Sequence, residues 1–297
     1  MTIQWFPGHM TKAKRMVEEN LRRVDIILEL LDARVPAASR NPLISELTLG
    51  KPRLILLNKS DLADVKETDR WVNHFKATQD IQAMPIEAMR EHGVKKIEGA
   101  VRKVVDAHRK ENGQRPLDRR YRAMAVGIPN VGKSSLINRL AMRKIARTGD
   151  EPAVTRKAQW VRMSKEMELL DMPGILWHKF EDQRVGAYLA ATGAIKDAVI
   201  DIHDIACFAI QTLGRIDPEH IKGRYKLKEL NEDPRITLED IGRKRGCLRP
   251  GGVVDVEKAG QLVIRELRGG KLGRITLQTV AAFEDELRFA RDEYHNN

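Results

Sequence analysis

The chain has 297 residues, 42% hydrophobic and 32% charged, which is enough to bury the core of one large or two ordinary domains. It holds no apolar run near the roughly 18–20 residues of a membrane span, and its N-terminus lacks the apolar middle of a secretory signal. Cys207 and Cys247 lie far apart without metal-ligand spacing. Composition therefore excludes a membrane protein and a disulfide framework, and it predicts a cytoplasmic protein.

The charge is distributed unevenly along the chain. Its formal net value is +11, but residues 1–179 carry +12 and residues 180–297 carry −1. Basic clusters occur at 108–122, 139–147 and 155–157. Two interpretations stay open, a solvated basic surface or a face for a polyanion such as RNA.

Strand-like and helix-like patterns alternate through the first part of the chain. Apolar runs predict strands within 25–34, 53–61, 80–88 and 121–126, and 157–174 reads as two strands joined by a tight turn at 164–166. Helical patterns occupy 65–78, 94–110 and the segment after 132. This alternation predicts an α/β fold with a mostly parallel sheet and helices on both faces.

After Gly174 the pattern becomes helical. Residues 181–214 and 217–246 are mostly helical in pattern, LRPGGVVD interrupts them, a helix follows over 256–267, and a last acidic helix begins near Leu277. We expect a boundary near 178–182, with one domain over 1–178 and a small all-α domain over 179–297.

A glycine-rich loop lies between a predicted strand and a predicted helix. GIPNVGKSS (127–135) fits G-x-x-x-x-G-K-[ST], in which backbone N–H groups and the positive helix end hold phosphate oxygens. Lys133 should reach the β- and γ-phosphates and Ser134 should ligate Mg²⁺. The predicted phosphate-binding residues are Asn130, Val131, Gly132, Lys133, Ser134, Ser135 and Gly174. This loop predicts a nucleoside triphosphate without specifying its base.

NKSD (58–61) follows another predicted strand and supplies the base preference. Asp61 can accept two hydrogen bonds from the N1–H and N2 edge of guanine, an edge that adenine lacks. Asn58 is expected to brace the loop, and the stem of Lys59 can lie along the purine face. Alone, NKSD would be a common surface turn; with the phosphate loop it predicts a guanine site.

Two further residues complete the predicted phosphate site. In LLDMPG, Asp171 would hold Mg²⁺ through water, and the Gly174 N–H would meet the γ-phosphate. Thr155 lies between the phosphate loop and this strand pair, and its hydroxyl is the expected Mg²⁺ and γ-phosphate ligand.

These loops occur in an unusual chain order. The base-reading loop NKSD comes first, followed by the phosphate loop, Thr155 and the DxxG motif of residues 171–174. This order is a cyclic rotation of the usual order in guanine-nucleotide switches. Rotation leaves the spatial arrangement intact where termini are close. The prediction is a circularly permuted Ras-like P-loop GTPase domain followed by a helical domain, with the γ-phosphate switch joined directly to that second domain.

The motifs together resemble the circularly permuted GTPases of the ribosome biogenesis GTPase A (YlqF/RbgA) family. The resemblance rests on WFPGHM, DAR.P, SRNP, NKSD, GIPNVGKSS, Thr155, DMPG and CLRPGG…GGKLGRI, which span nearly the whole chain. It implies a monomeric bacterial cytoplasmic GTPase that acts late in assembly of the large ribosomal subunit. The implied partners are GTP and GDP, rRNA and ribosomal proteins.

The resemblance also suggests how hydrolysis occurs. Ras-like switches place a water-orienting glutamine after DxxG, but this chain has Ile175 there. The resemblance points instead to His9 of WFPGHM, whose imidazole can exchange hydrogen bonds with water at neutral pH; a turn-capping role is the alternative. A resemblance to potassium-stimulated GTPases suggests that the Asn130 side-chain oxygen helps hold K⁺ between the β- and γ-phosphates, with loop bracing as its alternative.

The guanine-supporting loop departs from the family pattern. Its usual Ser-Ala reads Glu87-Ala88 here, and Ala88 is expected to present its backbone N–H to guanine O6. In the C-terminal domain, glycine-flanked basic segments are the RNA candidates, namely Arg243, Lys244, Arg245, Arg249, Lys271 and Arg274.

Other functions fit part of the pattern. A nucleotide-gated RNA-binding module with incidental hydrolysis would suit Ile175, and an rRNA or a tRNA could be its partner. A P-loop kinase or ATPase would suit the phosphate loop, although Asp61 favours guanine.

Overall fold

The computed structural model describes residues 8–90, 92–141, 158–176, 180 and 182–295, with the backbone alone described at 8–13 and 288–295. These residues divide into two compact units, one of Phe180–Leu277 and one of the residues before it together with those from Gln278 onward. Among the described residues no helix is long and apolar enough to cross a membrane.

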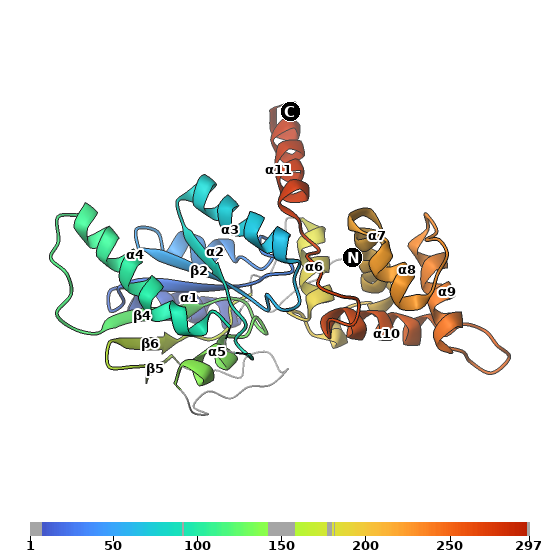
Figure 1. The fold of residues 1–297 in the computed structure, drawn as a ribbon, viewed down its shortest axis with the longest axis horizontal. Coiled ribbons are helices and arrows are strands. Elements are labelled where there is room, and N and C mark those ends of the chain that lie inside the picture. The colour runs from blue at the N-terminus through green and yellow to red at the C-terminus, as the bar shows by residue number, and fades with distance from the viewer. Residues whose placement is uncertain (1–7, 91, 142–157, 177–179, 181, 296–297) are drawn as a thin grey trace. The chain divides into compact units, whose positions relative to one another are not determined.

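A six-stranded mixed sheet forms the centre of the larger unit (Figure 1). The strand order is β3-β2-β1-β4-β6-β5, and all neighbouring pairs are parallel except β5 with β6. The strands are β1 (Ile26–Asp32), β2 (Arg53–Asn58), β3 (Gln82–Pro85), β4 (Tyr121–Val126), β5 (Gln159–Arg162) and β6 (Met167–Asp171). This confirms the predicted α/β sheet, including the tight β5–β6 turn.

Helices cover both faces of the sheet because β1, β2 and β4 are apolar on both sides. On one face, α1 (Gly8–Leu21), α2 (Pro42–Leu47), α3 (Val65–Gln79) and α11 (Val280–His295) pack through the clusters around Ile27 and Leu31. On the other lie α4 (Ile97–Glu111), preceded by the 3-10 turn η1 (Val94–Lys96), and α5 (Lys133–Leu140). The sequence patterns predicted α3, α4 and α5 but not α1 and α2.

The C-terminal helix α11 belongs to the sheet unit. Phe283 packs on Trp71 of α3 with ring centroids 5.3 Å apart, and Glu67 accepts a 2.6 Å hydrogen bond from Val280 N–H. The Trp71 indole donates to Gln278 O at 2.8 Å. The expected helical domain over 179–297 therefore differs from the observed unit, which ends at Leu277, because α11 places its apolar residues on α3.

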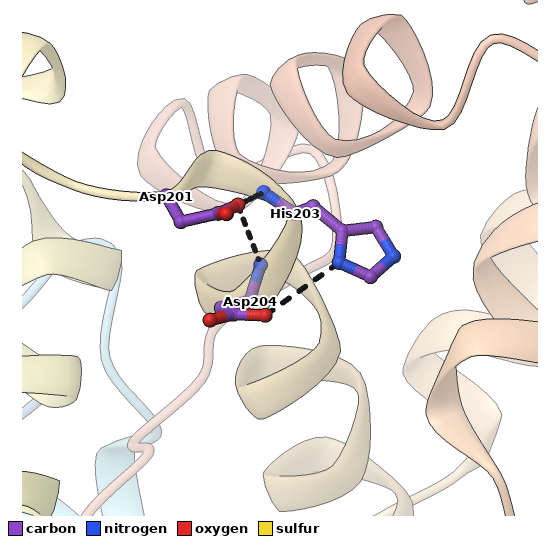
Figure 2. A group of neighbouring side chains, drawn as sticks. All are labelled: Asp201, His203 and Asp204. Carbon is purple, nitrogen blue, oxygen red and sulfur yellow. Dashed lines mark hydrogen bonds and ion pairs between the residues drawn. The ribbon is translucent and has the colours of Figure 1, made fainter. Parts of the chain in front are cut away.

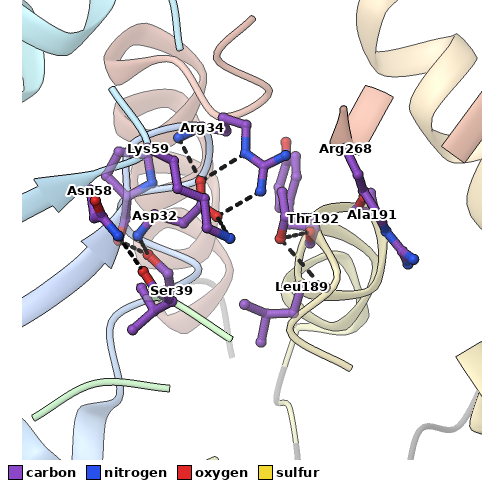
Figure 3. Close-up of polar contacts among 12 residues, drawn as sticks. Asp32, Arg34, Ser39, Asn58, Lys59, Leu189, Ala191, Thr192 and Arg268 are labelled. Carbon is purple, nitrogen blue, oxygen red and sulfur yellow. Dashed lines mark hydrogen bonds and ion pairs between the residues drawn. The ribbon is translucent and has the colours of Figure 1, made fainter. Parts of the chain in front are cut away.

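The smaller unit is helical throughout. It contains α6 (Gln183–Thr192), the 3-10 turn η2 (Asp197–Val199), α7 (Ile202–Ile216), α8 (Glu219–Tyr225), α9 (Pro234–Arg245) and α10 (Val256–Arg268). α10 packs against α6, α7 and α9 through Val263, Ile264 and neighbouring small residues. Arg268 at its end donates to Ala190 O and Ala191 O, which satisfies carbonyls at the end of α6 (Figure 3).

Asp201, His203 and Asp204 cluster at the start of α7 (Figure 2). Their potential ligand atoms lie within 4.8 Å of one another. Asp201 Oδ1 accepts hydrogen bonds from the His203 and Asp204 N–H groups at 2.9 and 3.2 Å, so it is the N-cap of α7. Helix capping accounts for this arrangement.

Candidate nucleotide-binding site

The phosphate loop follows β4 and opens α5, as the motif requires. Gly127 has φ +153°, and a Cβ there would lie 2.7 Å from Leu30 O, so the loop turns tightly against β1. Lys133 is buried at the start of α5, and its Nζ donates to Gly127 O and Ile128 O at 2.9 Å each. The loop therefore wraps around the lysine that is predicted to meet the phosphates.

Asn58 joins the base-reading loop to the phosphate loop. Its Nδ2 donates to Val131 O at 2.8 Å, and its Oδ1 accepts from Ala88 N–H at 3.0 Å. Asn58 is 3% exposed, so water competes little for these bonds. One side chain thus connects three segments that lie far apart in the sequence.

Gly132 is required by this connection. Its φ is +103°, and a Cβ there would lie 2.1 Å from Asn58 Nδ2. Distances under 3.0 Å do not occur for real Cβ atoms, so any larger residue must displace Asn58 or the loop. The motif glycine therefore serves the base-reading loop as well as the phosphate loop.

The DxxG segment lies against the phosphate loop. A Cβ on Gly174 would lie 3.0 Å from Pro129 Cα and 3.2 Å from Lys133 Nζ, and Ile175 N–H donates to Gly127 O at 3.2 Å. Asn41 of SRNP donates to Ile175 O at 2.9 Å while its Oδ1 caps α2. Asn41 is a site-supporting residue that motif reasoning missed.

Burial and charge set the state of Lys133. Burial lowers the pKa of its ammonium to about 8, and the Asp171 carboxylate opposes that shift in part. Asp171 ends β6 beside Ala125 of β4 and is 4% exposed. A phosphate anion would supply negative charge beside the same ammonium.

The two predicted Mg²⁺ ligands that the structure describes are oxygen donors at the ends of neighbouring elements. Asp171 ends β6, and Ser134 lies in the first turn of α5 directly after Lys133. A carboxylate and a hydroxyl beside a phosphate are the donor set that Mg²⁺ prefers, so these residues fit the ion. Thr155, the third predicted ligand, lies outside the described residues.

The base-reading loop is held on several sides. Ser60 N–H and Oγ–H donate to Ile86 O at 3.3 and 3.0 Å, and Arg139 of α5 donates to Met89 O at 2.6 Å. Asp61 lies 3.8 Å from Arg90 Nε and stays 19% exposed, so its carboxylate can meet a ligand. Arg139 is a second supporting residue that the sequence did not single out.

Two predicted base-contacting groups have partners within the chain. Lys59 places its Nζ 3.0 Å from Asp32 Oδ2, and the Ala88 N–H, expected at guanine O6, bonds to Asn58. Asn130 has a left-handed backbone with φ +57° inside the phosphate loop, followed by buried Val131. Ser135 is half-buried in the first turn of α5.

The remaining predicted residues fall in two groups. His9 is in α1, but its side chain lies outside the described residues. In the helical unit, Arg243 pairs with Glu239 and Asp240 at 2.8 Å each, Arg249 with Asp255 at 3.2 Å, and Arg245 lies over the Tyr225 ring. The other RNA candidates are exposed, namely Lys244, Lys271 and Arg274.

The sheet order and the site together define a circularly permuted P-loop GTPase. A family model described as a 50S ribosome-binding GTPase matches residues 122–239. The chain is 49% identical over 290 residues to ribosome biogenesis GTPase A of Bacillus cereus, covering 97% of each, and 32% identical over 281 residues to that of Thermotoga maritima, covering 93% and 94%. The chain belongs to the ribosome biogenesis GTPase A family.

The chain is also similar in structure to solved structures of YlqF. The GNP-bound YlqF of T. maritima superposes with a TM-score of 0.58 at 30% identity, over 90% of this chain and 98% of that one. A GDP-bound TM YlqF gives a TM-score of 0.61 at 29% identity, over 89% and 99%.

We expect Gly132→Ala to lower GTP affinity at least about tenfold, or about 1.4 kcal/mol, because its Cβ displaces Asn58. Isothermal titration with GDP and a non-hydrolysable GTP analogue measures this. The matched control is Gly99→Ala in α4, where a Cβ meets nothing within 4 Å. Equal affinity in the parent and the Gly132 variant would contradict the constraint.

Nucleotide binding should take up a proton near pH 8. Since the pKa of Lys133 is about 8, phosphate should raise it and drive uptake of about half a proton at that pH, falling toward zero at pH 7. Titrations in buffers of different ionisation enthalpy count this proton. Uptake that does not grow between pH 7 and pH 8 would mean that the Lys133 ammonium is fully charged before binding.

Proposed function

We propose that this GTPase is a cytoplasmic monomer that acts in late assembly of the large ribosomal subunit and hydrolyses GTP when the particle is bound. The full-length similarity to ribosome biogenesis GTPases supports the ribosomal partner. The Asn58 bridge supports the guanine nucleotide, because it holds base-reading and phosphate loops in one unit. Precursor rRNA and ribosomal proteins are the proposed contacts.

The observation that carries the dependence on a partner is the burial of Ile175. Ile175 is 2% exposed and packs in the cluster with Val17, Ile44 and Met124. Because the Ile175 side chain is apolar and buried, it cannot hydrogen-bond the attacking water, and it contributes packing rather than catalysis. Another group must orient the attacking water, and we assign that role to His9.

The position of α1 supports this assignment. Its Val17 lies in the same buried cluster as Ile175, and Ile175 directly follows the DxxG glycine. This shared cluster supports a position of α1 near the predicted γ-phosphate loop. Contacts with the particle would then fix the segment that contains His9 for hydrolysis.

Cations complete the proposed site. Ser134, Thr155 and Asp171 would hold Mg²⁺, which neutralises charge on the β- and γ-phosphates when bound. Asn130 is the proposed K⁺ ligand; its left-handed backbone places the residue within the turn of the phosphate loop. Bracing of the loop remains the other role for this side chain.

The helical unit is the proposed RNA contact. Lys244, Lys271 and Arg274 are exposed, and glycine flanks each segment that carries them. The internal ion pairs of Arg243 and Arg249 would have to open before these two arginines could contact a phosphate.

Purified large ribosomal subunits should raise steady-state GTP hydrolysis at least tenfold, lowering the barrier by at least about 1.4 kcal/mol. We expect His9→Ala to keep its GTP affinity and to lose most of that stimulation. The control is His108→Ala on α4. The helix α4 precedes β4, and His108 lies away from the carboxyl end of β4, where the phosphate loop begins. Equal stimulated rates in His9→Ala and the parent would remove His9 from catalysis. Normal GTP binding without stimulation would instead favour a nucleotide-gated RNA-binding module.

Replacing KCl with NaCl at equal ionic strength should lower the hydrolysis rate, because Na⁺ is a poorer match for a site sized for K⁺. Asn130→Asp tests the ligand: a retained oxygen donor should keep the potassium dependence, while Asn130→Ala should lose it. A rate that depends only on ionic strength would assign Asn130 to loop bracing.

A further inference from the structure

The DAR segment lies directly beside the base-reading loop. Asp32 ends β1 in register with Asn58, the last residue of β2, and Ala33 N–H donates to Asn58 O at 2.9 Å. Asp32, Arg34 and Lys59 converge there in one charged cluster (Figure 3). Phosphate binding and base reading, as described above, assign no role to Asp32 or Arg34.

The cluster is buried and closely paired. Arg34 Nε donates to Asp32 Oδ1 at 2.9 Å and Arg34 Nη2 to Oδ2 at 2.8 Å, while Lys59 Nζ lies 3.0 Å from Oδ2. Asp32 and Arg34 are each 2% exposed. Although burial alone would raise the pKa of Asp32, Arg34 and Lys59 together hold it well below its usual range. The carboxylate is therefore charged whenever the chain is folded near neutral pH.

The position of Asp32 is fixed by hydrogen bonds other than its ion pair with Lys59. Its backbone N–H donates to Ser39 Oγ at 3.0 Å, and its Oδ1 also accepts from Arg34 N–H at 3.1 Å. The loop is fastened at its far side, where Ala38 N–H donates to Gln278 Oε1 at 2.8 Å. Asp32 is thus a fixed point and Lys59 is the part that it holds.

Lys59 needs such a support because its backbone is strained. Its φ is +60°, a left-handed conformation that costs a non-glycine residue of order 1 kcal/mol. Leu62 N–H donates to Lys59 O at 2.9 Å, which closes the turn on the backbone side. The ion pair with Asp32 fixes the other end, so the aliphatic stem of Lys59 is held at both ends.

We propose that Asp32 is a positioning residue for guanine recognition, which tethers the Lys59 ammonium so that its stem forms a fixed platform for the purine face. The inference rests on the proposed binding of guanine at NKSD. A tethered stem loses little side-chain entropy when a base stacks on it, and this lowers the cost of binding. Arg34 binds both oxygens of the Asp32 carboxylate and keeps it in place.

The platform acts on the base and not on the phosphates. Lys59 and Asp32 lie on the base-reading side, whereas the phosphate loop closes around Lys133 through Gly127 and Ile128 carbonyls. Loss of the tether should therefore weaken guanine nucleotides selectively. A general loss of folding would weaken every ligand of the site.

The test compares two ligands on the full-length protein. Asp32→Asn keeps the size of the side chain and an oxygen that accepts from Arg34 N–H, but it removes the charge that holds Lys59. We expect GDP affinity to fall about tenfold, or about 1.4 kcal/mol, while inorganic tripolyphosphate, which contacts the phosphate loop alone, binds as in the parent. Asp69→Asn, at an exposed position of α3, is the matched control.

A double-mutant cycle shows whether Asp32 acts through Lys59. Lys59→Met keeps an apolar stem without the ammonium. It tests the platform even if Asp32→Asn does not fold because Arg34 is left buried without its carboxylate partner. The proposal requires that Lys59→Met weakens GDP about as much as Asp32→Asn and that the double variant adds no further loss. Equal loss for GDP and tripolyphosphate, additive losses, or an unchanged Lys59→Met would overturn it.

The affinity of the parent for ADP and its stimulation by ribosomal subunits separate a failure of this inference from a failure of the proposed function. If the parent binds ADP as tightly as GDP, the guanine assignment fails and the platform has no base to support. If subunit stimulation is absent but GDP and tripolyphosphate respond differently to Asp32→Asn, the ribosomal proposal fails while the platform stands.

Discussion

The site depends on one buried side chain that joins its parts. Asn58 holds the carbonyl of Val131 on one side and the N–H of Ala88 on the other, so the three loops share a single fixed point. In a buried setting these bonds meet little competition from water, and the loss of either would leave a backbone group unsatisfied. The same bridge requires a glycine at position 132, because a Cβ there would overlap the Asn58 side chain.

This bridge explains why the order of the loops along the chain does not disturb the chemistry. The strands that carry the loops keep parallel neighbours, with Asp32 opposite Asn58 and Ala125 opposite Asp171. Only the connections between them differ. What the rotation changes is the route of the chain: after DxxG it enters the helical unit, and it returns to the sheet unit at Gln278.

The sequence predicted the parts of the site whose spacing is set by backbone geometry. A phosphate loop and a base reader each work through consecutive residues, so Gly132, Lys133 and Asn58 could be found without a structure. The roles of Asn41 and Arg139 could not, because each side chain binds a carbonyl far away in the sequence, although Asn41 itself lies in SRNP. Lys59 and Ala88 were correctly located in their loops, but their observed partners are Asp32 and Asn58, which only the register of β1 and β2 brings near.

The same reasoning applies to the fold. Alternating apolar runs predicted the strands, and long periodic segments predicted α3 and α4. The short helix α2 contains only Pro42–Leu47, and its start is defined by the Asn41 cap rather than by periodicity. The helix over Val280–His295 was expected, but its place against Trp71 depends on a contact between residues more than half the chain apart. Periodicity carries no information about such a partner.

The two lysines of the site, Lys59 and Lys133, have different electrostatic surroundings. Lys59 forms an ion pair with the buried Asp32 carboxylate, which Arg34 also binds, so the Lys59 ammonium has a fixed anionic partner in the folded chain. Lys133 is held by carbonyl oxygens, and burial outweighs Asp171, so its ammonium is costly to keep charged. An anionic phosphate removes that cost, whereas a base alone does not. A phosphate ligand would therefore change the charge balance at Lys133 and not at Lys59, which fits separate roles for the two lysines in the proposed switch.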